Sequence, residues 1–154
     1  PAFYLPAILA SSNDLGTFSK TGQRRDLNRE KFEANRLNQI LSNFDSPASK
    51  NISYLNHAIQ VRSKIKAFHP ESPMKCLSKK ALDHVTIQRG INNEKVYAMY
   101  NMTDKDLKLA LLDEIDLDIN NSNCKLLDSL SGNIYKAFNI SLKPYQVMWL
   151  TLLD

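Results

Sequence analysis

The spacing of hydrophobic residues changes from helical to extended at two prolines, Pro70 and Pro73. Before them, hydrophobic residues recur at intervals of three and four, which is typical of amphipathic helices. This spacing predicts helices over residues 30–44 and roughly 53–68. Beyond the prolines, short hydrophobic runs that alternate with polar residues are separated by Asn and Gly turns, which predicts five or six strands of a small antiparallel sheet or sandwich.

The change of pattern predicts two domains, residues 1–69 and residues 70–154. Trp149 alternates with Val147 near the end, and a large aromatic side chain dominates a small core, so we expect Trp149 to be largely buried on the final strand. The other predicted strands are residues 85–89 and 96–102 around a turn at 90–93, 107–112, 124–127, and a run with Ile140 and Leu142.

A polar segment with three arginines, Arg24, Arg25 and Arg29, follows an apolar run at residues 2–9 that is predicted to be a buried strand. A strand, a long loop and a helix in this order place chemistry at the carboxyl end of a parallel strand. Long irregular loops are often functional. Guanidinium groups can bind a carboxylate or a phosphate in a fork. For any one of these arginines, an ion pair or a capping role is an equally good interpretation.

Two further residues of this segment, Asn13 and Asp14, follow the predicted strand directly. Their side chains could orient a sugar hydroxyl. The alternative is a turn or a helix cap, which we favour because Asn and Asp readily form hydrogen bonds to nearby backbone. An acidic run at residues 113–118 lacks the glycine and the closing glutamate of a calcium loop, and it is interpreted as solvated surface.

The composition is that of an ordinary globular protein of 154 residues, with 43% hydrophobic and 23% charged residues. No run is apolar enough for a membrane span and no basic leader is visible, so a cytoplasmic location without membrane contact is expected. The net charge of +4 is concentrated before residue 71. Nucleic-acid binding ranks third among the possible functions, because these basic residues are interspersed with acids.

Several segments, in this order along the chain, resemble the C-terminal portion of sucrose phosphorylase and its relatives. These are glycoside phosphorylases of the α-amylase superfamily, glycoside hydrolase family thirteen. The most specific block is RDLNRE, and the ending PYQVMWL is weaker. The segments that carry the resemblance are LASSND (9–14), TGQRRDLNREKF (21–32), AFHPE (67–71), DSLSG (128–132) and ISLKPYQVMWL (140–150).

This resemblance implies an α+β fragment. Residues 1–69 would be the last strand, the active-site loop and two helices of a TIM-type (β/α)8 barrel, and residues 70–154 a C-terminal antiparallel β domain. The parent enzyme would transfer an α-glucosyl group from sucrose or a related small glucoside to inorganic phosphate, through a covalent glucosyl-enzyme. The alternative function is a non-catalytic carbohydrate-binding or interaction module.

The resemblance also assigns roles to single residues. The first arginine of the RDLNR block, Arg25, would reach the acceptor side of the active site and contact the acceptor sugar or phosphate. Arg24 is a secondary candidate, and Asp26 and Arg29 would support the loop. The catalytic carboxylates of the family lie on earlier barrel strands, so this chain is expected to have no catalytic residue and to be inactive without the missing N-terminal barrel portion. No metal or cofactor is expected.

Overall fold

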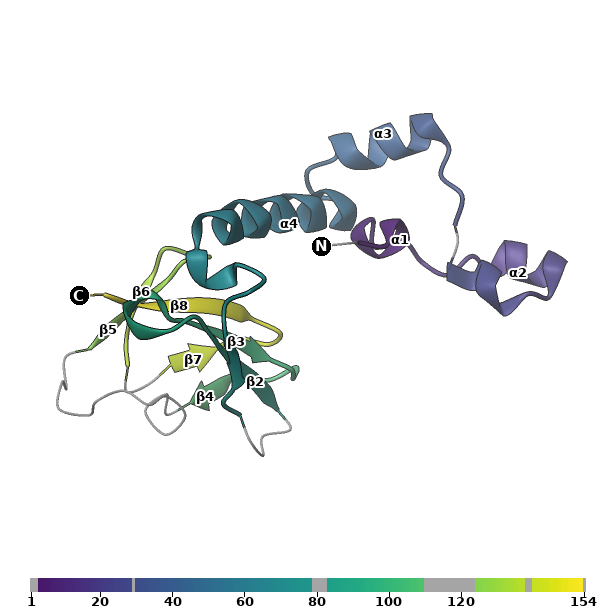
Figure 1. Ribbon diagram of the computed structural model, residues 1–154. Helices are drawn as coiled ribbons and strands as arrows, with labels where there is room; N and C mark the ends of the chain where they lie inside the picture. The colour runs from purple at the N-terminus through teal and green to yellow at the C-terminus, as the bar shows by residue number, and fades with distance from the viewer. Residues whose placement is uncertain (1–2, 29, 79–82, 110–123, 138–139, 154) are drawn as a thin grey trace. The chain divides into compact units, whose positions relative to one another are not determined.

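The computed structural model describes residues 3–28, 30–78, 83–109, 124–137 and 140–153, and the chain divides into two compact units (Figure 1). Unit 1 is Pro1–Ile59 and unit 2 is Gln60–Asp154. The division falls inside a helix, whereas the sequence pattern places the domain boundary between residues 69 and 70. The last turn of that helix therefore belongs with the sheet of unit 2.

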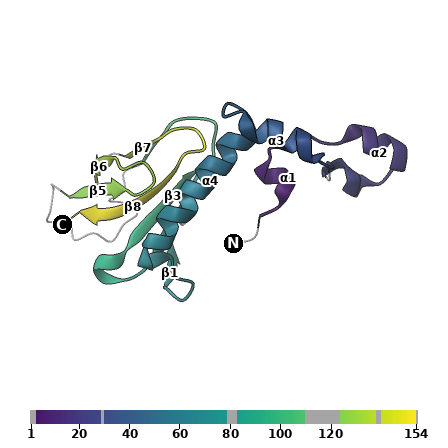
Figure 2. The ribbon, with the colours of Figure 1, turned by 90° about the horizontal axis from the view of Figure 1, so that it is seen from above.

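The described part of unit 1 is helical, and the helix that ends in unit 2 is its longest element (Figure 2). Pro47 begins this helix, where the missing proline N–H costs nothing, and Arg62 and Lys64 in its last turn complement the helix dipole. None of the helices in the described ranges has the length and apolar character needed to cross a membrane. The elements are α1 (Leu5–Ile8), α2 (Leu15–Thr21), a 3₁₀ helix η1 (Arg24–Asn28), α3 (Ala34–Ser42) and α4 (Pro47–Lys64).

The two predicted helices are confirmed as α3 and α4, but the strand predicted at residues 2–9 is wrong where the structure describes it. Leu5–Ile8 forms the short helix α1, with a proline in its first turn. A strand needs a neighbour to pair its backbone groups, whereas a helical turn pairs them within itself. No described segment pairs with these residues as a strand, and the local helical turn forms instead.

The segment predicted as an irregular loop, residues 10–29, is also more ordered than expected, because it contains α2 and η1. Asp14 caps the start of α2, and Gly22 ends it with a left-handed backbone at φ 67°. Both are standard helix-end signals. The cap at Asp14 is the interpretation favoured from the sequence, whereas the helix that Asp14 begins is not predicted by the hydrophobic pattern.

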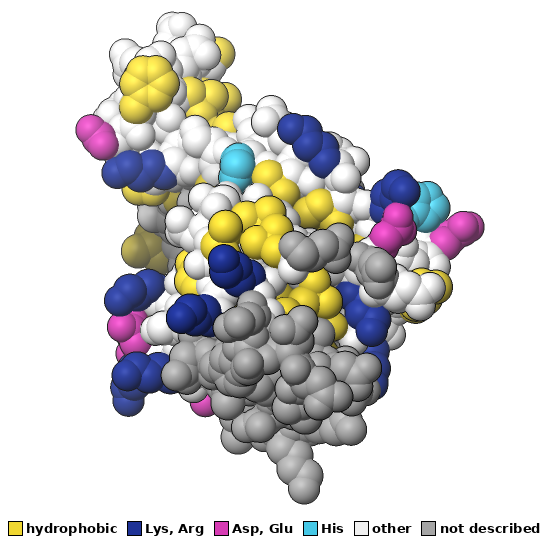
Figure 3. Space-filling model, turned by 90° about the vertical axis from the view of Figure 1, so that its left-hand side faces the viewer, with side chains coloured by type: hydrophobic (Ala, Val, Ile, Leu, Met, Phe, Trp, Pro, Cys, Tyr) yellow, Lys and Arg dark blue, Asp and Glu magenta, His cyan; other side chains and the backbone are white. Residues whose placement is uncertain are grey.

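The helical stripes predicted to pack into a core are only partly covered in unit 1. Tyr54 is 54% exposed and Phe44 is 84% exposed, while Leu9 and Ala48 are the buried hydrophobic residues in the described part of this unit. Figure 3 shows hydrophobic side chains at the surface beside Lys and Arg. A helical period identifies the apolar face of a helix, but it does not provide the element that covers that face.

Unit 2 is built around a six-stranded antiparallel sheet with the order β1-β2-β3-β8-β5-β6, and a two-stranded sheet β4-β7. The strand prediction missed β1 and β6, whose side chains are mostly exposed and therefore give no buried apolar alternation. The described strands are β1 (Met74–Cys76), β2 (His84–Arg89), β3 (Val96–Asn101), β4 (Leu107–Leu109), β5 (Lys125–Asp128), β6 (Ile134–Lys136), β7 (Ile140–Leu142) and β8 (Val147–Leu153). The predicted α+β class with a small antiparallel β domain is confirmed.

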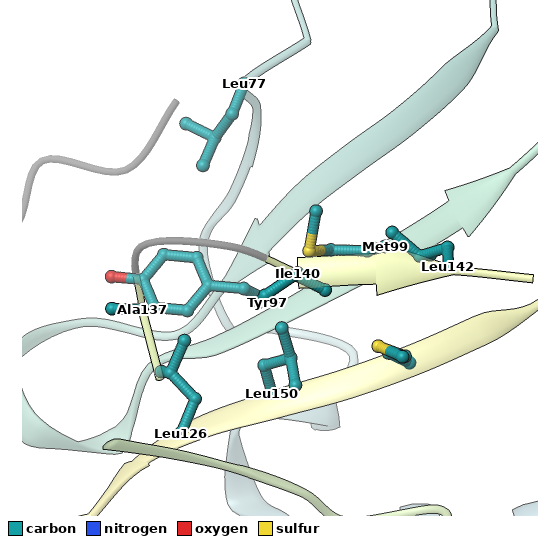
Figure 4. Close-up of a cluster of buried hydrophobic side chains, with 9 residues drawn as sticks. Leu77, Tyr97, Met99, Leu126, Ala137, Ile140, Leu142 and Leu150 are labelled. Carbon is teal, nitrogen blue, oxygen red and sulfur yellow. The ribbon is translucent and has the colours of Figure 1, made fainter. Parts of the chain in front are cut away.

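The core of unit 2 lies between the two sheets. Ile140 and Leu142 from β7 lie beside Tyr97 and Met99 from β3, together with Leu150 from β8 (Figure 4). All five side chains are fully buried. Alternation along the strands places every second residue on this inner face.

Trp149 is on β8 as expected, but it is only partly buried, on the face opposite the core. Its neighbours Met148 and Leu150 are the buried residues of that strand. The alternation along β8 is as predicted, but its inner face carries Met148 and Leu150, so aromatic size does not indicate the inner face here. On its own face, Trp149 packs against Phe68 of the 3₁₀ helix η2 (Lys66–Phe68), with ring centroids 4.7 Å apart.

Candidate functional site

Asp14 is a helix cap in the structure. Its carboxylate accepts hydrogen bonds from the Thr17 backbone N–H at 2.8 Å and from the Thr17 hydroxyl at 2.6 Å. These hydrogen bonds, that from the Thr17 side chain foremost, lower the pKa of Asp14 below its ordinary value. The cap interpretation is therefore confirmed for Asp14. Asn13 beside it is exposed.

The two candidate arginines of the RDLNR block stand on η1, and both side chains are exposed. The Arg25 Nε donates to the side-chain oxygen of Gln23 at 2.8 Å. No ion pair to a described carboxylate forms at Arg24 or Arg25, although ion pairing was the alternative interpretation for these residues. Arg29 lies outside the described residues.

Asp26 behaves as a support of this segment. Its carboxylate accepts a hydrogen bond from the Thr21 hydroxyl at 2.6 Å, which ties η1 to the end of α2. A second tie joins the backbone N–H of Asp14 to the carbonyl of Leu27 at 2.7 Å. These two ties hold α2 and η1 together as a helical hairpin. Arg24 and Arg25 project from this hairpin into solvent.

The arrangement offers charge and hydrogen-bond donors but no acid–base pair. Two exposed guanidinium groups can bind an anionic or hydroxyl-rich ligand. No described group of three or more His, Cys, Asp or Glu side chains could hold a metal ion. The acidic run at 113–118 lies outside the described residues.

An apolar pocket of about 260 Å³ in unit 1 was not anticipated. It lies between α1 and α4, and Tyr4 at its edge also donates from its hydroxyl to the carbonyl of Asn28 at 2.6 Å. The apolar residues at the start of the chain are the signal for this pocket in the sequence, but their pattern predicts a strand instead. The lining residues are Phe3, Tyr4, Ala7, Ile8, Asn51, Tyr54 and Leu55.

The chain is similar in sequence to two known enzymes. The chain is 27% identical over 150 residues, 97% of its length, to a glucosylglycerate phosphorylase of Allomeiothermus silvanus. It is 26% identical to the glucosylglycerate phosphorylase of Escherichia coli K12, also over 97% of its length. It spans about a quarter of the length of these relatives, 24% and 25%. No family model matches the chain.

The fold recurs in solved structures of the α-amylase family. An α-amylase of Anoxybacillus superposes with a TM-score of 0.55 at 18% identity, over 71% of this chain and 24% of the other. Such neighbours are (β/α)8-barrel proteins matched over a small part of their length. The predicted resemblance is thereby confirmed, and this chain is similar to a portion of the glycoside phosphorylases and shares its fold with part of the α-amylase-family enzymes.

Proposed function

We propose that this chain is part of a retaining glycoside phosphorylase that transfers an α-glucosyl group from a small glucoside to inorganic phosphate. The observation that carries the proposal is the similarity to two glucosylglycerate phosphorylases over 97% of the chain. Sucrose or a related small glucoside would be the donor. The names of the two relatives favour glucosylglycerate over sucrose as this donor.

In this reaction the bond from glucosyl C1 to the leaving oxygen breaks while a general acid protonates that oxygen and a carboxylate nucleophile bonds to C1. A phosphate oxygen then displaces that carboxylate, and the same acid/base group takes up the phosphate proton. The nucleophile and the acid/base would come from barrel strands outside this chain. Within the chain, Arg25 would act on the incoming phosphate. Its exposed guanidinium has no described carboxylate partner, and a cation placed at an incoming dianion offsets the cost of concentrating charge.

The missing barrel portion would be the main protein partner. Unit 1 exposes apolar side chains of α1 and α4, and Phe3, Tyr4 and Tyr54 are each about half exposed, at 48%, 52% and 54%. A contiguous apolar surface of this kind is typical of a protein–protein contact.

The test of Arg25 is its replacement by alanine in the full-length enzyme that carries this segment. Phosphorolysis efficiency should fall roughly 10- to 150-fold, because a charge-assisted hydrogen bond contributes about 1.5–3 kcal/mol. Formation of the glucosyl-enzyme should change much less. Arg25→Lys should recover part of the loss, since an ammonium cannot form the fork.

The competing account makes Arg25 a support of its loop. It expects equal losses with phosphate and with water as acceptor, together with a lower melting temperature. Asp26→Ala serves as the structural control, because its carboxylate ties η1 to α2. Phosphate-dependent cleavage of glucosylglycerate or sucrose by the 154-residue chain alone would refute the assignment of the catalytic carboxylates to other segments.

A further inference from the structure

A second pocket, of about 230 Å³, lies in unit 2 on the face of the six-stranded sheet that is opposite the core. The strand register places Ile87, Ala98 and Trp149 side by side on this face. The residues that give the pocket its chemistry are Arg62, Phe68, Met74, Arg89, Tyr100 and Trp149. All of them belong to unit 2, so the pocket is formed within one compact body.

Three aromatic side chains form much of its wall. Phe68, Tyr100 and Trp149 are each partly buried, and Phe68 and Trp149 are tilted against each other by 57°. Packed rings of this kind are rigid and present flat apolar surface at the pocket. A concave, mostly apolar site with a few fixed polar groups is the usual design of a small-molecule site.

Two arginines supply the polar groups. Arg62 donates from Nη2 to the carbonyl of Phe68 at 3.0 Å. Arg89 donates from Nε to the carbonyl of Ala67 at 3.3 Å and from Nη2 to that of His69 at 2.6 Å. These bonds hold both guanidinium groups at the pocket, which lowers the entropy lost when a ligand binds.

Neither guanidinium has a carboxylate partner within the described ranges. Each arginine carries five N–H donors. Arg62 uses one of them in the bond above, and Arg89 uses two there and a third in a long contact of 4.0 Å to the sulfur of Met74. Two positive charges with spare donors therefore stand beside an aromatic wall.

We propose that this pocket binds a monosaccharide-sized ligand that carries one anionic group, a phosphate or a carboxylate. The arginines would bind the anion through charge-assisted hydrogen bonds, and the aromatic wall would pack against the ring. Sites for drug-sized ligands usually measure about 300–1,000 Å³, so a volume of about 230 Å³ suits a single ring. The proposal uses no residue of unit 1 and does not depend on the role of Arg25.

Trp149 makes the test direct, because it is the single tryptophan of the chain. The pure chain is titrated with glucose 1-phosphate, glucuronate, glucose and inorganic phosphate up to tens of millimolar while Trp149 fluorescence is recorded. We expect a saturable change with glucose 1-phosphate or glucuronate, and the stronger of the two identifies the anionic group. Glucose and inorganic phosphate should each bind at least tenfold more weakly.

Arg62→Gln should weaken binding about 10- to 150-fold, the loss expected for a charge-assisted hydrogen bond. Arg62→Lys keeps the charge but cannot form the fork, so its affinity should lie between those of the unchanged chain and Arg62→Gln. Lys66→Gln is the matched control: it removes a positive charge from the neighbouring turn, where Lys66 pairs with Glu94 and does not line the pocket. It should leave the affinity unchanged.

Three results would overturn the proposal. The first is the absence of any saturable Trp149 response to either anionic sugar with the folded chain. The second is equal binding of inorganic phosphate alone, which would mean that the ring is not recognised. The third is an equal loss of affinity in Arg62→Gln and Lys66→Gln. That result would mean that the ligand is attracted by the general positive charge, and that the two arginines only support the backbone carbonyls of residues 67–69.

Discussion

Asn101 holds together three segments of unit 2 through a single buried side chain. Its amide nitrogen donates to the carbonyls of Lys105 at 2.7 Å and Lys143 at 2.8 Å, and its oxygen accepts from the backbone N–H and hydroxyl of Thr103. Only 3% of the residue is exposed. A buried polar side chain with all its hydrogen bonds stabilises the fold, and removing it leaves its buried partners without hydrogen bonds, which destabilises the fold.

We therefore expect Asn101→Ala to lower the free energy of unfolding of unit 2 by about 2–5 kcal/mol. Asn101→Asp should be at least as damaging, because it points an oxygen at two carbonyls. Urea unfolding followed by Trp149 fluorescence measures both. Asn133→Ala, at an exposed position of the same unit, should change little, and an equal effect there would contradict the account.

Asp14 gives a pH-dependent prediction at the same scale. Its pKa is lowered in the folded chain by the bonds from Thr17. A lowered pKa means that the stabilisation is present above the unfolded value, about 4, and is lost as the pH falls through the folded value. The amides of α2 should lose protection in that acidic range by NMR. In Asp14→Asn, which does not titrate, protection should be independent of pH there.

At the scale of elements, the β2–β3 connection depends on Gly90. Its φ is +80°, and a Cβ at this position would lie 2.5 Å from the carbonyl oxygen of Glu94 and 3.0 Å from the Cβ of Ala67. Both the left-handed backbone and the close approach require glycine. The turn signal was visible in the sequence, but the backbone contact that makes glycine necessary was not.

Gly90→Ala should destabilise unit 2 by about 2–4 kcal/mol, the sum of left-handed strain and overpacking. Gly132→Ala separates these two effects, because Gly132 has φ +75° with nothing within 4 Å of the added Cβ. It should cost only the strain, about 1–2 kcal/mol. Equal shifts of the urea midpoint for the two variants would show that the contact with Glu94 does not matter.

At the scale of the whole molecule, the two units differ in how much hydrophobic surface they bury. The described part of unit 1 buries two hydrophobic residues, Leu9 and Ala48, whereas unit 2 has a continuous cluster around Tyr97, Met99 and Leu150. Local opening is easiest where few apolar contacts would be broken. The stability of this chain should therefore reside mainly in the sheet.

Hydrogen exchange followed by mass spectrometry should show this division. Amides of β3 and β8 should exchange only on global unfolding of unit 2, and those of α3 at near the rate of an unstructured chain. Leu9→Ala should leave the Trp149 unfolding midpoint unchanged. Protection of α3 equal to that of β3 would mean that unit 1 has a stabilising core of its own.

The class of the fold could be inferred from the amino-acid sequence alone, because periodicity is local. The stripes of α3 and α4, the strands β2 and β3 and the turn at Gly90 could all be recognised from neighbouring residues. The resemblance to a glycoside phosphorylase was also readable, from the RDLNRE block and the order of the other motifs. The ligand-binding roles of Arg24 and Arg25 remain predictions, and the structure shows that both stand exposed on η1.

Which face of each element is covered becomes clear only from the folded chain. Residues 5–8 belong to an apolar run that was predicted as a strand, but they form α1, because no described neighbour pairs with them. Trp149 lies opposite the core because β4 and β7 cover the other face of the sheet, where Met148 and Leu150 are buried. Arg62 and Arg89, 27 positions apart in the sequence (89 − 62), meet at one pocket only after the sheet and the end of α4 have packed. Burial and pairing depend on contacts between distant residues, and no local pattern contains them.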